Sequence, residues 1–355
     1  MRAMLRLLPL LIGLLLLPLF VARVGLRPIA QELQQLGPGV LWILVPYAAG
    51  TALSAVPWAW LLPAQHRPGW AQTLAGRFAA SGANALLPFF GLAGEPCRLL
   101  WLERSARAEG LAGIVIDRLL YNAAGGVLLL LAALPAWRTP LTPQLIAAGV
   151  GAAALIIGLS AVTLYAITRW RIGRGVQRVL RRILGSAARE SALGERVDEA
   201  LRSMAQQRSG ALLPAQLVHC VARAVMCLEV YLVLRSLHAP ATLGHVLVLS
   251  SVPVATSVFA SAIPSQIGVQ EGAQAFVCGA LGLDPALGLV LVLLQRARQL
   301  AFAPLTLILL AAARSSGAPS AAAPPSAGTA PSAMGERAVS CESQAWPPRA
   351  EQKPH

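Results

Sequence analysis

Two glutamates stand in otherwise apolar sequence, and each lies seven residues after a proline. Pro88 precedes Glu95 in the first element, and Pro264 precedes Glu271 in the second. Proline opens a helix because it lacks a backbone N–H. A broken, polar element survives at membrane depth only where it lines protein or a water-filled cavity. Two matching interruptions of this kind indicate a transporter-like site at a repeat interface.

Each element is followed by an apolar segment that carries an arginine beside a second polar residue. Asp117 and Arg118 follow the first element, and Arg296 follows the second. Neighbouring residues on a helix point about 100° apart, so Asp117 and Arg118 should each reach a different element rather than pair with each other. We therefore predict the ion pairs Glu95–Arg118 and Glu271–Arg296.

These charges suit the binding of a lipid phosphate. A guanidinium group donates two parallel hydrogen bonds to phosphate, and the predicted donors are Arg98, Arg118 and Arg296. The three acidic residues would hold these arginines while the site is empty, or carry a coupling proton. Alternatively, the charges form structural ion pairs that pin broken helices together, since an unpaired charge in a bilayer costs about 3 kcal/mol or more.

Other residues of the two elements are expected to shape the candidate site. Asparagine can cap freed backbone groups, and proline and glycine open the helix. The residues in question are Asn84, Pro88, Gly94, Pro264 and Gly268. A further apolar segment carries charges without a helix break, and we interpret those charges as structural: Arg223, Glu229 and Arg235.

The composition is that of an integral membrane protein. Hydrophobic residues make up 56% of the chain and charged residues only 12%, whereas soluble domains carry about a quarter charged residues. A helix needs about 20 apolar residues to span a bilayer. We predict an all-α polytopic protein with about seven spans, at 5–25, 39–62, 110–135, 143–168, 212–237, 242–263 and 285–312. Residues 70–104 and 264–283 are predicted to form re-entrant hairpins.

Arginine placement predicts the orientation. Ten arginines fall between residues 169 and 208, so the positive-inside rule places the 169–211 loop, and with it the N-terminus, in the cytoplasm. The same rule counts Arg98 among the cytoplasmic charges. Apolar residues at helical spacing within the loop predict amphipathic helices on the inner leaflet. Nucleic-acid binding is disfavoured because no aromatic platform accompanies the arginines.

The two repeated elements would run in the same sense under this topology, related by an axis normal to the membrane. If 264–283 is a hairpin, the last span runs outward and the tail is external; if it crosses fully, the tail is cytoplasmic. We expect one transmembrane domain over residues 1–313. The Ala-, Pro- and Ser-rich residues 314–355 are expected to be disordered, because they cannot bury enough apolar surface.

No pattern in the sequence indicates catalysis. The nucleophile-elbow, zinc-protease, P-loop and dinucleotide-binding motifs do not occur. The five cysteines show no C-x-x-C pair and no metal-ligand spacing. We therefore expect no enzymatic activity, no metal and no cofactor.

The order and spacing of the motifs resemble the lysylphosphatidylglycerol synthase transmembrane-region family, also described as flippase-like. The resemblance rests on Asn84-x-x-x-Pro88, Gly94-Glu95-x-x-Arg98, Asp117-Arg118 and Pro264-x-x-x-Gly268-Val-x-Glu271. It extends over about residues 5–313 and implies a multi-pass protein of the bacterial inner membrane that moves or handles lipids. Family members usually carry more glycine in the second element, where this chain has Ser265, Gln266 and Ile267. Full synthases also have a soluble aminoacyl-transfer domain; this chain ends at His355, so we expect no lysyl transfer by this polypeptide alone.

The sequence thus favours a lipid flippase or lipid-transport component that passes headgroups along a polar groove between the two elements. Its expected partners are membrane lipids with anionic or phosphate-bearing headgroups. Two alternatives stay open: a non-transporting membrane partner of a separate lipid-modifying enzyme, and a transporter of a small soluble solute.

Overall fold

The computed structural model describes residues 40–86, 94–169, 191–207, 209–259, 266, 268–302, 304–305, 308–309 and 311–312. The predicted first span at 5–25 lies outside these residues, and so do Pro88 and Pro264. The chain divides into two units, Met1–Ala318 and Pro319–His355. Everything below concerns the first.

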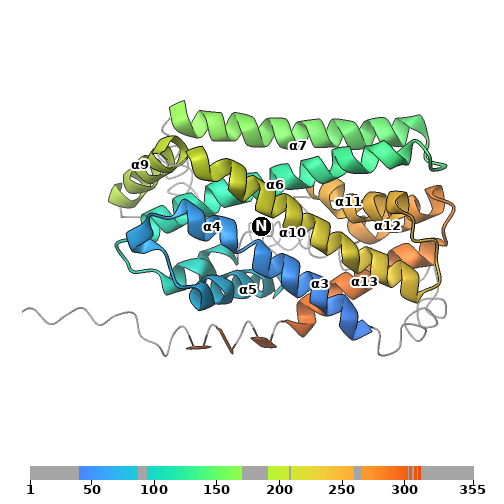
Figure 1. The fold of residues 1–355 in the computed structure, drawn as a ribbon, viewed down its shortest axis with the longest axis horizontal. Coiled ribbons are helices and arrows are strands. Elements are labelled where there is room, and N and C mark those ends of the chain that lie inside the picture. Colours follow the sequence, from blue (N-terminus) through green and yellow to red (C-terminus); the bar gives the residue numbers. More distant parts are fainter. Residues whose placement is uncertain are drawn as a thin grey trace, which may run out of the picture. The chain divides into compact units, whose positions relative to one another are not determined.

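Every regular element in the described residues is helical, which confirms the all-α class (Figure 1). The α-helices are α3 (Val40–Leu53), α4 (Val56–Leu61), α5 (Trp70–Leu86), α6 (Arg107–Ala136), α7 (Pro143–Arg169), α9 (Ser191–Gln207), α10 (Ser209–Ser236), α11 (Leu243–Phe259), α12 (Val269–Ala280) and α13 (Pro285–Ala301). Two 3₁₀ helices are present, η2 (Ala64–His66) and η3 (Glu95–Trp101).

Three of the described helices are long and apolar enough to cross a membrane. They are α6, α10 and the Pro143–Ile167 part of α7, which match the predicted spans at 110–135, 212–237 and 143–168. The predicted span at 39–62 is instead divided into α3 and α4 by a turn at Ser54 and Ala55. Helices α11 and α13 have 17 residues each. The count of seven spans therefore stays a prediction.

The relative directions of the long helices follow from their contacts. Asp117 and Tyr121 on α6 contact His219 and Arg223 on α10. Both pairs are offset by the same number of residues, so α6 and α10 run parallel. α7 follows α6 after a short turn and packs along it (Figure 1). These directions agree with the topology predicted from a cytoplasmic 169–211 loop. In that topology the spans at 110–135 and 212–237 run in one direction and the span at 143–168 runs in the other.

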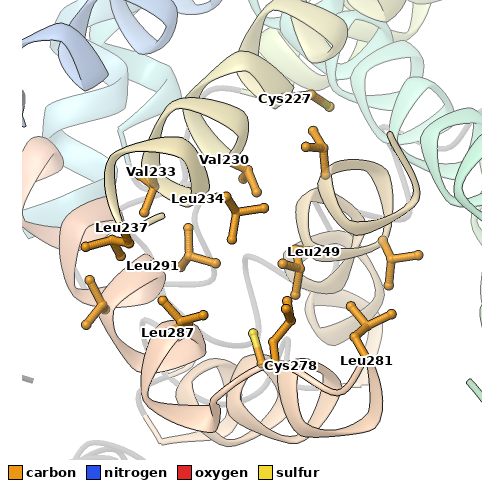
Figure 2. Close-up of a cluster of buried hydrophobic side chains, with 14 of the residues drawn as sticks. Cys227, Val230, Val233, Leu234, Leu237, Leu249, Cys278, Leu281, Leu287 and Leu291 are labelled. Carbon is orange, nitrogen blue, oxygen red and sulfur yellow. The ribbon is translucent and has the colours of Figure 1, made fainter. Parts of the chain in front are cut away.

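A large apolar core lies where α10, α11, α12 and α13 meet (Figure 2). α10 contributes Cys227, Val230, Val233 and Leu234 to this core, at the spacing of one helix face, and Leu237 just after α10 joins them. Figure 2 places Leu287 and Leu291 of α13 beside the end of α10. The later part of α13 reaches back to the middle of α10, where Arg298 pairs with Glu229.

α13 therefore runs antiparallel to α10, and so to α6. The helices that follow the two glutamate elements run in opposite directions, which is the relation of inverted repeats. The prediction that both units run in the same sense is wrong. It treated residues 264–283 as a complete hairpin, after which the last helix would run in the same direction as α6. The end of α13 lies on the same side of the bundle as the beginnings of α6 and α10.

The first predicted hairpin is present as α5 and η3 packed side by side. A Cβ atom on Gly94 would lie 2.2 Å from the carbonyl oxygen of Ala80, and one on Gly76 would lie 3.4 Å from the Cα atom of Arg98. Ala80 in the later part of α5 thus faces Gly94, whereas Gly76 in the earlier part faces Arg98. The two limbs of the hairpin therefore run antiparallel. Gly94 is required here because any side chain would collide with the α5 backbone.

The second predicted hairpin is formed differently. Residues 269–280 make a single helix, α12, and its antiparallel partner is α13. The turn between them contains Gly282, whose φ of 75° favours glycine. A Cβ atom on Gly288 would lie 2.6 Å from the backbone of Gln274 and Ala275. The hairpin therefore comprises α12 and α13 rather than residues 264–283 alone.

Helix α9 corrects the expectation for the basic loop. Its apolar residues Ala200, Leu201 and Met204 are buried in a second core with residues of α4 and α6. α9 also packs against α7. Protein, rather than the inner leaflet, covers this apolar face. The first amphipathic segment of the loop lies outside the described residues.

The close approach of α12 and α13 gives a stability prediction. We expect Gly288→Ala to lower the melting temperature in detergent, because overpacking against the Gln274 backbone costs about 1–3 kcal/mol. Gly158→Ala is the matched control on α7, where a Cβ atom meets nothing within 4 Å; it should leave the melting temperature unchanged or slightly raised. An unchanged Gly288→Ala protein would contradict the packing.

Candidate functional site

The deepest part of the site is a buried chain of three polar side chains. Arg98 Nη1 donates a hydrogen bond to Asp117 Oδ2 at 2.7 Å, and His219 Nε2 lies 2.9 Å from Asp117 Oδ1. These residues are 1% exposed or less. They come from η3, α6 and α10, so one carboxylate joins three elements. The guanidinium of Arg98 also lies over the ring of Trp58, 5.4 Å from its centre.

Glu95 is surrounded by arginines. Its carboxylate lies 3.4 Å from Arg98 Nε and 3.6 Å from both Arg77 Nη1 and Arg118 Nε. Asn84 supports the same group: its Nδ2 donates to Glu95 at 3.3 Å, and its Oδ1 accepts from the Gly94 N–H at 2.7 Å. The asparagine thus holds both the acid and the backbone beside it.

Glu95 lies outside the three membrane-length helices, and its charge state follows from its neighbours. Burial by itself would raise the pKa of Glu95. The charges of Arg98, Arg118 and Arg77 outweigh that effect and hold the pKa below its ordinary value. Glu95 is therefore a carboxylate, the form that attracts these arginines.

Tyr121 on α6 gathers the remaining arginines. The guanidinium of Arg223 lies 4.0 Å from the centre of its ring, and those of Arg77 and Arg118 lie 5.6 Å from it. Arg223 Nη2 also donates to the Tyr121 carbonyl oxygen at 3.4 Å. A cation over an aromatic face is attracted by the ring's negative charge density. Tyr121 thus lets three like charges lie near one another.

We name this group the Tyr121 cluster; its members are Arg77, Glu95, Arg98, Asp117, Arg118, Tyr121, His219 and Arg223. It holds four arginines and two carboxylates, an excess of two positive charges before any charge on His219 is counted. Arg98 Nη2 and Arg223 Nε are buried without a hydrogen-bond partner in the described part of the chain. Tyr121 and Arg223 each lie about 21 Å along their helices, near the midpoints of α6 and α10. The cluster is therefore a positively charged site near the middle of two membrane-length helices.

The second element has the same plan. Glu271 is fully buried in the first turn of α12, where its Oε2 accepts the Gly268 N–H at 2.7 Å. Its Oε1 lies 2.7 Å from Arg296 Nε on α13. The Gln270 amide donates to Gln295 at 3.4 Å in the same gap. A carboxylate at a helix N-terminus is stabilised by the exposed N–H groups there.

A third ion pair joins α10 to α13. Glu229 is buried and pairs with Arg298. Arg298 lies over the ring of Tyr47, 4.3 Å from its centre, and Tyr47 shares a hydrogen bond of 2.8 Å with Ser81 of α5. This pair connects helices and fits the structural role inferred for Glu229. Arg235 is exposed.

The structure brings most of the predicted residues together in two groups. Both predicted ion pairs, Glu95–Arg118 and Glu271–Arg296, are confirmed. Asp117 reaches Arg98 and not its neighbour, as expected. Gly94 and Gly268 each present a backbone N–H to a site side chain.

The surroundings of two arginines could not be read from the sequence. Arg98 is 1% exposed and lies between Asp117 and Glu95 inside the protein; that this end of the hairpin is cytoplasmic stays a prediction. Arg223 lies in the Tyr121 cluster, and the interpretation of its charge as structural stays untested. Sequence reasoning missed three other members: Arg77, Tyr121 and His219. The only signal for Arg77 was a charge inside the apolar first hairpin; Tyr121 and His219 gave none.

The two elements are connected by packing of α13 against α5. Phe302, just after α13, stacks on Phe78 of α5 with 5.7 Å between ring centres. This contact brings the second arginine-bearing helix beside the first hairpin. That both glutamates line one polar groove stays a prediction. Within the described residues, no group of His, Cys, Asp and Glu side chains is placed to hold a metal ion.

The buried Arg98–Asp117 contact gives a second stability prediction. Asp117→Asn should destabilise the protein strongly, because breaking a buried pair leaves an uncompensated charge and costs about 3–5 kcal/mol. The double variant Arg98→Gln/Asp117→Asn should lose less than the two single variants together. Thermal unfolding in detergent measures both, with exposed Glu103→Gln as the control. Wild-type stability of Asp117→Asn would show that the pair is not needed.

Comparison with known proteins gives one match. The family described as "Lysylphosphatidylglycerol synthase TM region" matches residues 6–307, most of the chain. No curated protein and no solved structure matches the chain. The protein is a multi-pass membrane protein, and its matched region corresponds to the membrane part of a family associated with lipid modification and translocation. The chain belongs to the lysylphosphatidylglycerol synthase TM-region family.

Proposed function

We propose that this protein translocates lipids with anionic, phosphate-bearing headgroups, and that the Tyr121 cluster binds the headgroup at mid-depth. The observation that carries the proposal is the excess of two positive charges in a largely buried cluster. Charged groups inside a membrane are costly unless paired. A lipid phosphate would supply the missing negative charge, and guanidinium groups match its geometry.

The accessibility of the two predicted ion pairs supports this role. In each pair the carboxylate is buried and the arginine is partly exposed: Arg118 and Arg296 expose 22% and 24% of their side chains, whereas Glu95 and Glu271 expose 4% and 0%. A headgroup would therefore meet the arginines first. The acids would hold the arginines in place and release them to a phosphate. The structural pair Glu229–Arg298 has a weaker asymmetry of the same sense, 3% against 13%, so the excess of positive charge in the Tyr121 cluster remains the observation that carries the proposal.

The inverted relation of the two elements supports transport rather than static binding. Related elements of opposite direction allow a protein to present similar sites to the two sides of a membrane. We propose that Arg118 and Arg296 serve headgroups on successive parts of one path, in the bacterial inner membrane with the 169–211 loop cytoplasmic. The lipid tails would stay in the bilayer during the transfer.

Translocation in vesicles tests the proposal. Purified protein is reconstituted with a fluorescent phospholipid, and dithionite quenches the label in the outer leaflet. We expect Arg118→Gln and Arg296→Gln each to slow transfer by about tenfold, since a hydrogen bond to a charged group contributes about 1.5–3 kcal/mol. Arg118→Lys keeps the positive charge but loses the two parallel donors of the guanidinium group. Its rate of lipid transfer should therefore lie between the rates of Arg118→Gln and wild type.

The controls are two exposed arginines, Arg138→Gln and Arg235→Gln, which should transfer lipid at the wild-type rate. A ceramide with the same label lacks phosphate and should move no faster than in protein-free vesicles. Wild-type protein that moves neither lipid would refute translocation and favour a partner subunit of a lipid-modifying enzyme. Equal movement of both lipids would refute phosphate recognition.

A further inference from the structure

An apolar groove of about 400 Å³ lies between α6, α10 and the beginning of α11. α6 contributes one helical face to it, formed by Ala124, Val127, Leu128 and Leu131. α10 contributes a second face that runs from Cys220 to Tyr231, and α11 closes the far end with Leu243, Val246 and Leu247. One lining residue is charged, Arg223.

Arg223 belongs both to this groove and to the Tyr121 cluster. Its guanidinium lies over Tyr121, and Gly125 makes room for it: a Cβ atom there would lie 3.1 Å from Arg223 Nη2. Its Nε is buried without a hydrogen-bond partner among the described residues. Arg223 contacts the ring and the carbonyl oxygen of Tyr121, and it forms no ion pair with a carboxylate in the described part of the chain. The positive site and the apolar groove therefore meet at a single side chain.

The dimensions of the groove suit one hydrocarbon chain. From Cys220 to Tyr231 it extends about 16 Å along α10. The hydrocarbon core of a bilayer is about 30 Å thick, so this length corresponds to the chain region of one leaflet. The groove leads from mid-depth, where Arg223 lies, towards the ends of α6 and α10. It is too short to hold a chain that spans both leaflets.

We propose that this groove holds one acyl chain of a phosphate-bearing lipid while Arg223 binds the phosphate of the same molecule. The inference rests on the proposed function and deepens it by assigning the lipid tail a site of its own. The positive end and apolar walls match the two parts of such a lipid. In this arrangement Arg223 lies at the boundary between the two parts of the lipid. The headgroup lies on the side of Arg77 and Arg118, and the acyl chain lies in the groove.

Photo-crosslinking of the full-length protein in vesicles tests the groove. The probes are phosphatidylglycerol with a diazirine in one acyl chain and diacylglycerol with the same chain. We expect phosphatidylglycerol to label groove residues of α6 and α10, and excess unlabelled phosphatidylglycerol to compete with that labelling. Ala224→Trp, at an exposed groove position, should abolish it, while Leu217→Trp, exposed on α10 outside the groove, should not.

The role of Arg223 has a separate readout. Arg223→Gln should reduce labelling by phosphatidylglycerol about tenfold and leave labelling by diacylglycerol unchanged. Arg235→Gln on the same helix is the matched control. Thermal unfolding and gel filtration verify that each variant folds, and Ala224→Phe provides a smaller groove-filling change. Groove labelling that excess lipid does not reduce, or an unchanged preference in Arg223→Gln, would overturn the proposal.

The same variants separate this inference from the proposed function. If Ala224→Trp loses labelling but translocates lipid as wild type does, the groove is not on the path and the Tyr121 cluster proposal stands without it. If wild-type labelling is competed as expected but no lipid is translocated, the groove binds lipid and the transport proposal fails.

Discussion

The hydrogen-bonded pair of Arg98 and Asp117 is the contact on which the rest of this structure depends. It fixes η3 to α6, and through His219 it fixes both to α10. No water in a hydrocarbon environment would replace these bonds if they broke, so each partner requires the other. Gly76 of α5 packs directly against the Arg98 backbone. With Arg98 committed to Asp117, Glu95 is shared among Arg98, Arg77 and Arg118, and the remaining arginines collect around Tyr121.

The excess of arginine over carboxylate separates the first element from the second. Glu271–Arg296 and Glu229–Arg298 are balanced pairs, and either could serve only to join helices. The Tyr121 cluster is not balanced, and ring faces, which attract cations more weakly than a carboxylate does, offset part of the repulsion. The headgroup phosphate of the proposed function would offset this excess of positive charge.

Much of the site could be predicted because isolated charges in apolar sequence require partners. That argument alone gave Glu95–Arg118 and Glu271–Arg296, and the 100° separation of Asp117 from Arg118 predicted that they would diverge. The same argument could not predict contacts between helices that are distant in the sequence. Tyr121 and His219 join the site only because α6 and α10 pack in parallel, and the sequence did not indicate this packing. The direction of α13 was also missed, because hydropathy does not distinguish a hairpin within 264–283 from one closed at Gly282. Gln266 lies in the second element, at a position whose backbone conformation the sequence did not indicate. It adopts a φ of 51°, a conformation that glycine favours and that costs other residues about 1 kcal/mol.

Arg223 lies where the charged cluster and the apolar groove meet, which bears on the proposed transport of lipids. A lipid that crosses a bilayer must keep its headgroup in a polar environment and its chains in an apolar one, and the two environments must touch all along the path. In this protein they touch at one arginine, whose guanidinium lies on the Tyr121 ring and also lines the apolar groove. Gly125 leaves space for this contact, since a Cβ atom there would lie 3.1 Å from Arg223 Nη2. The two helices that create the boundary, α6 and α10, run parallel and place Tyr121 and Arg223 at the same depth. The parallel packing of two membrane-length helices therefore brings the buried charges beside an apolar groove, which is the arrangement that the proposed lipid site requires.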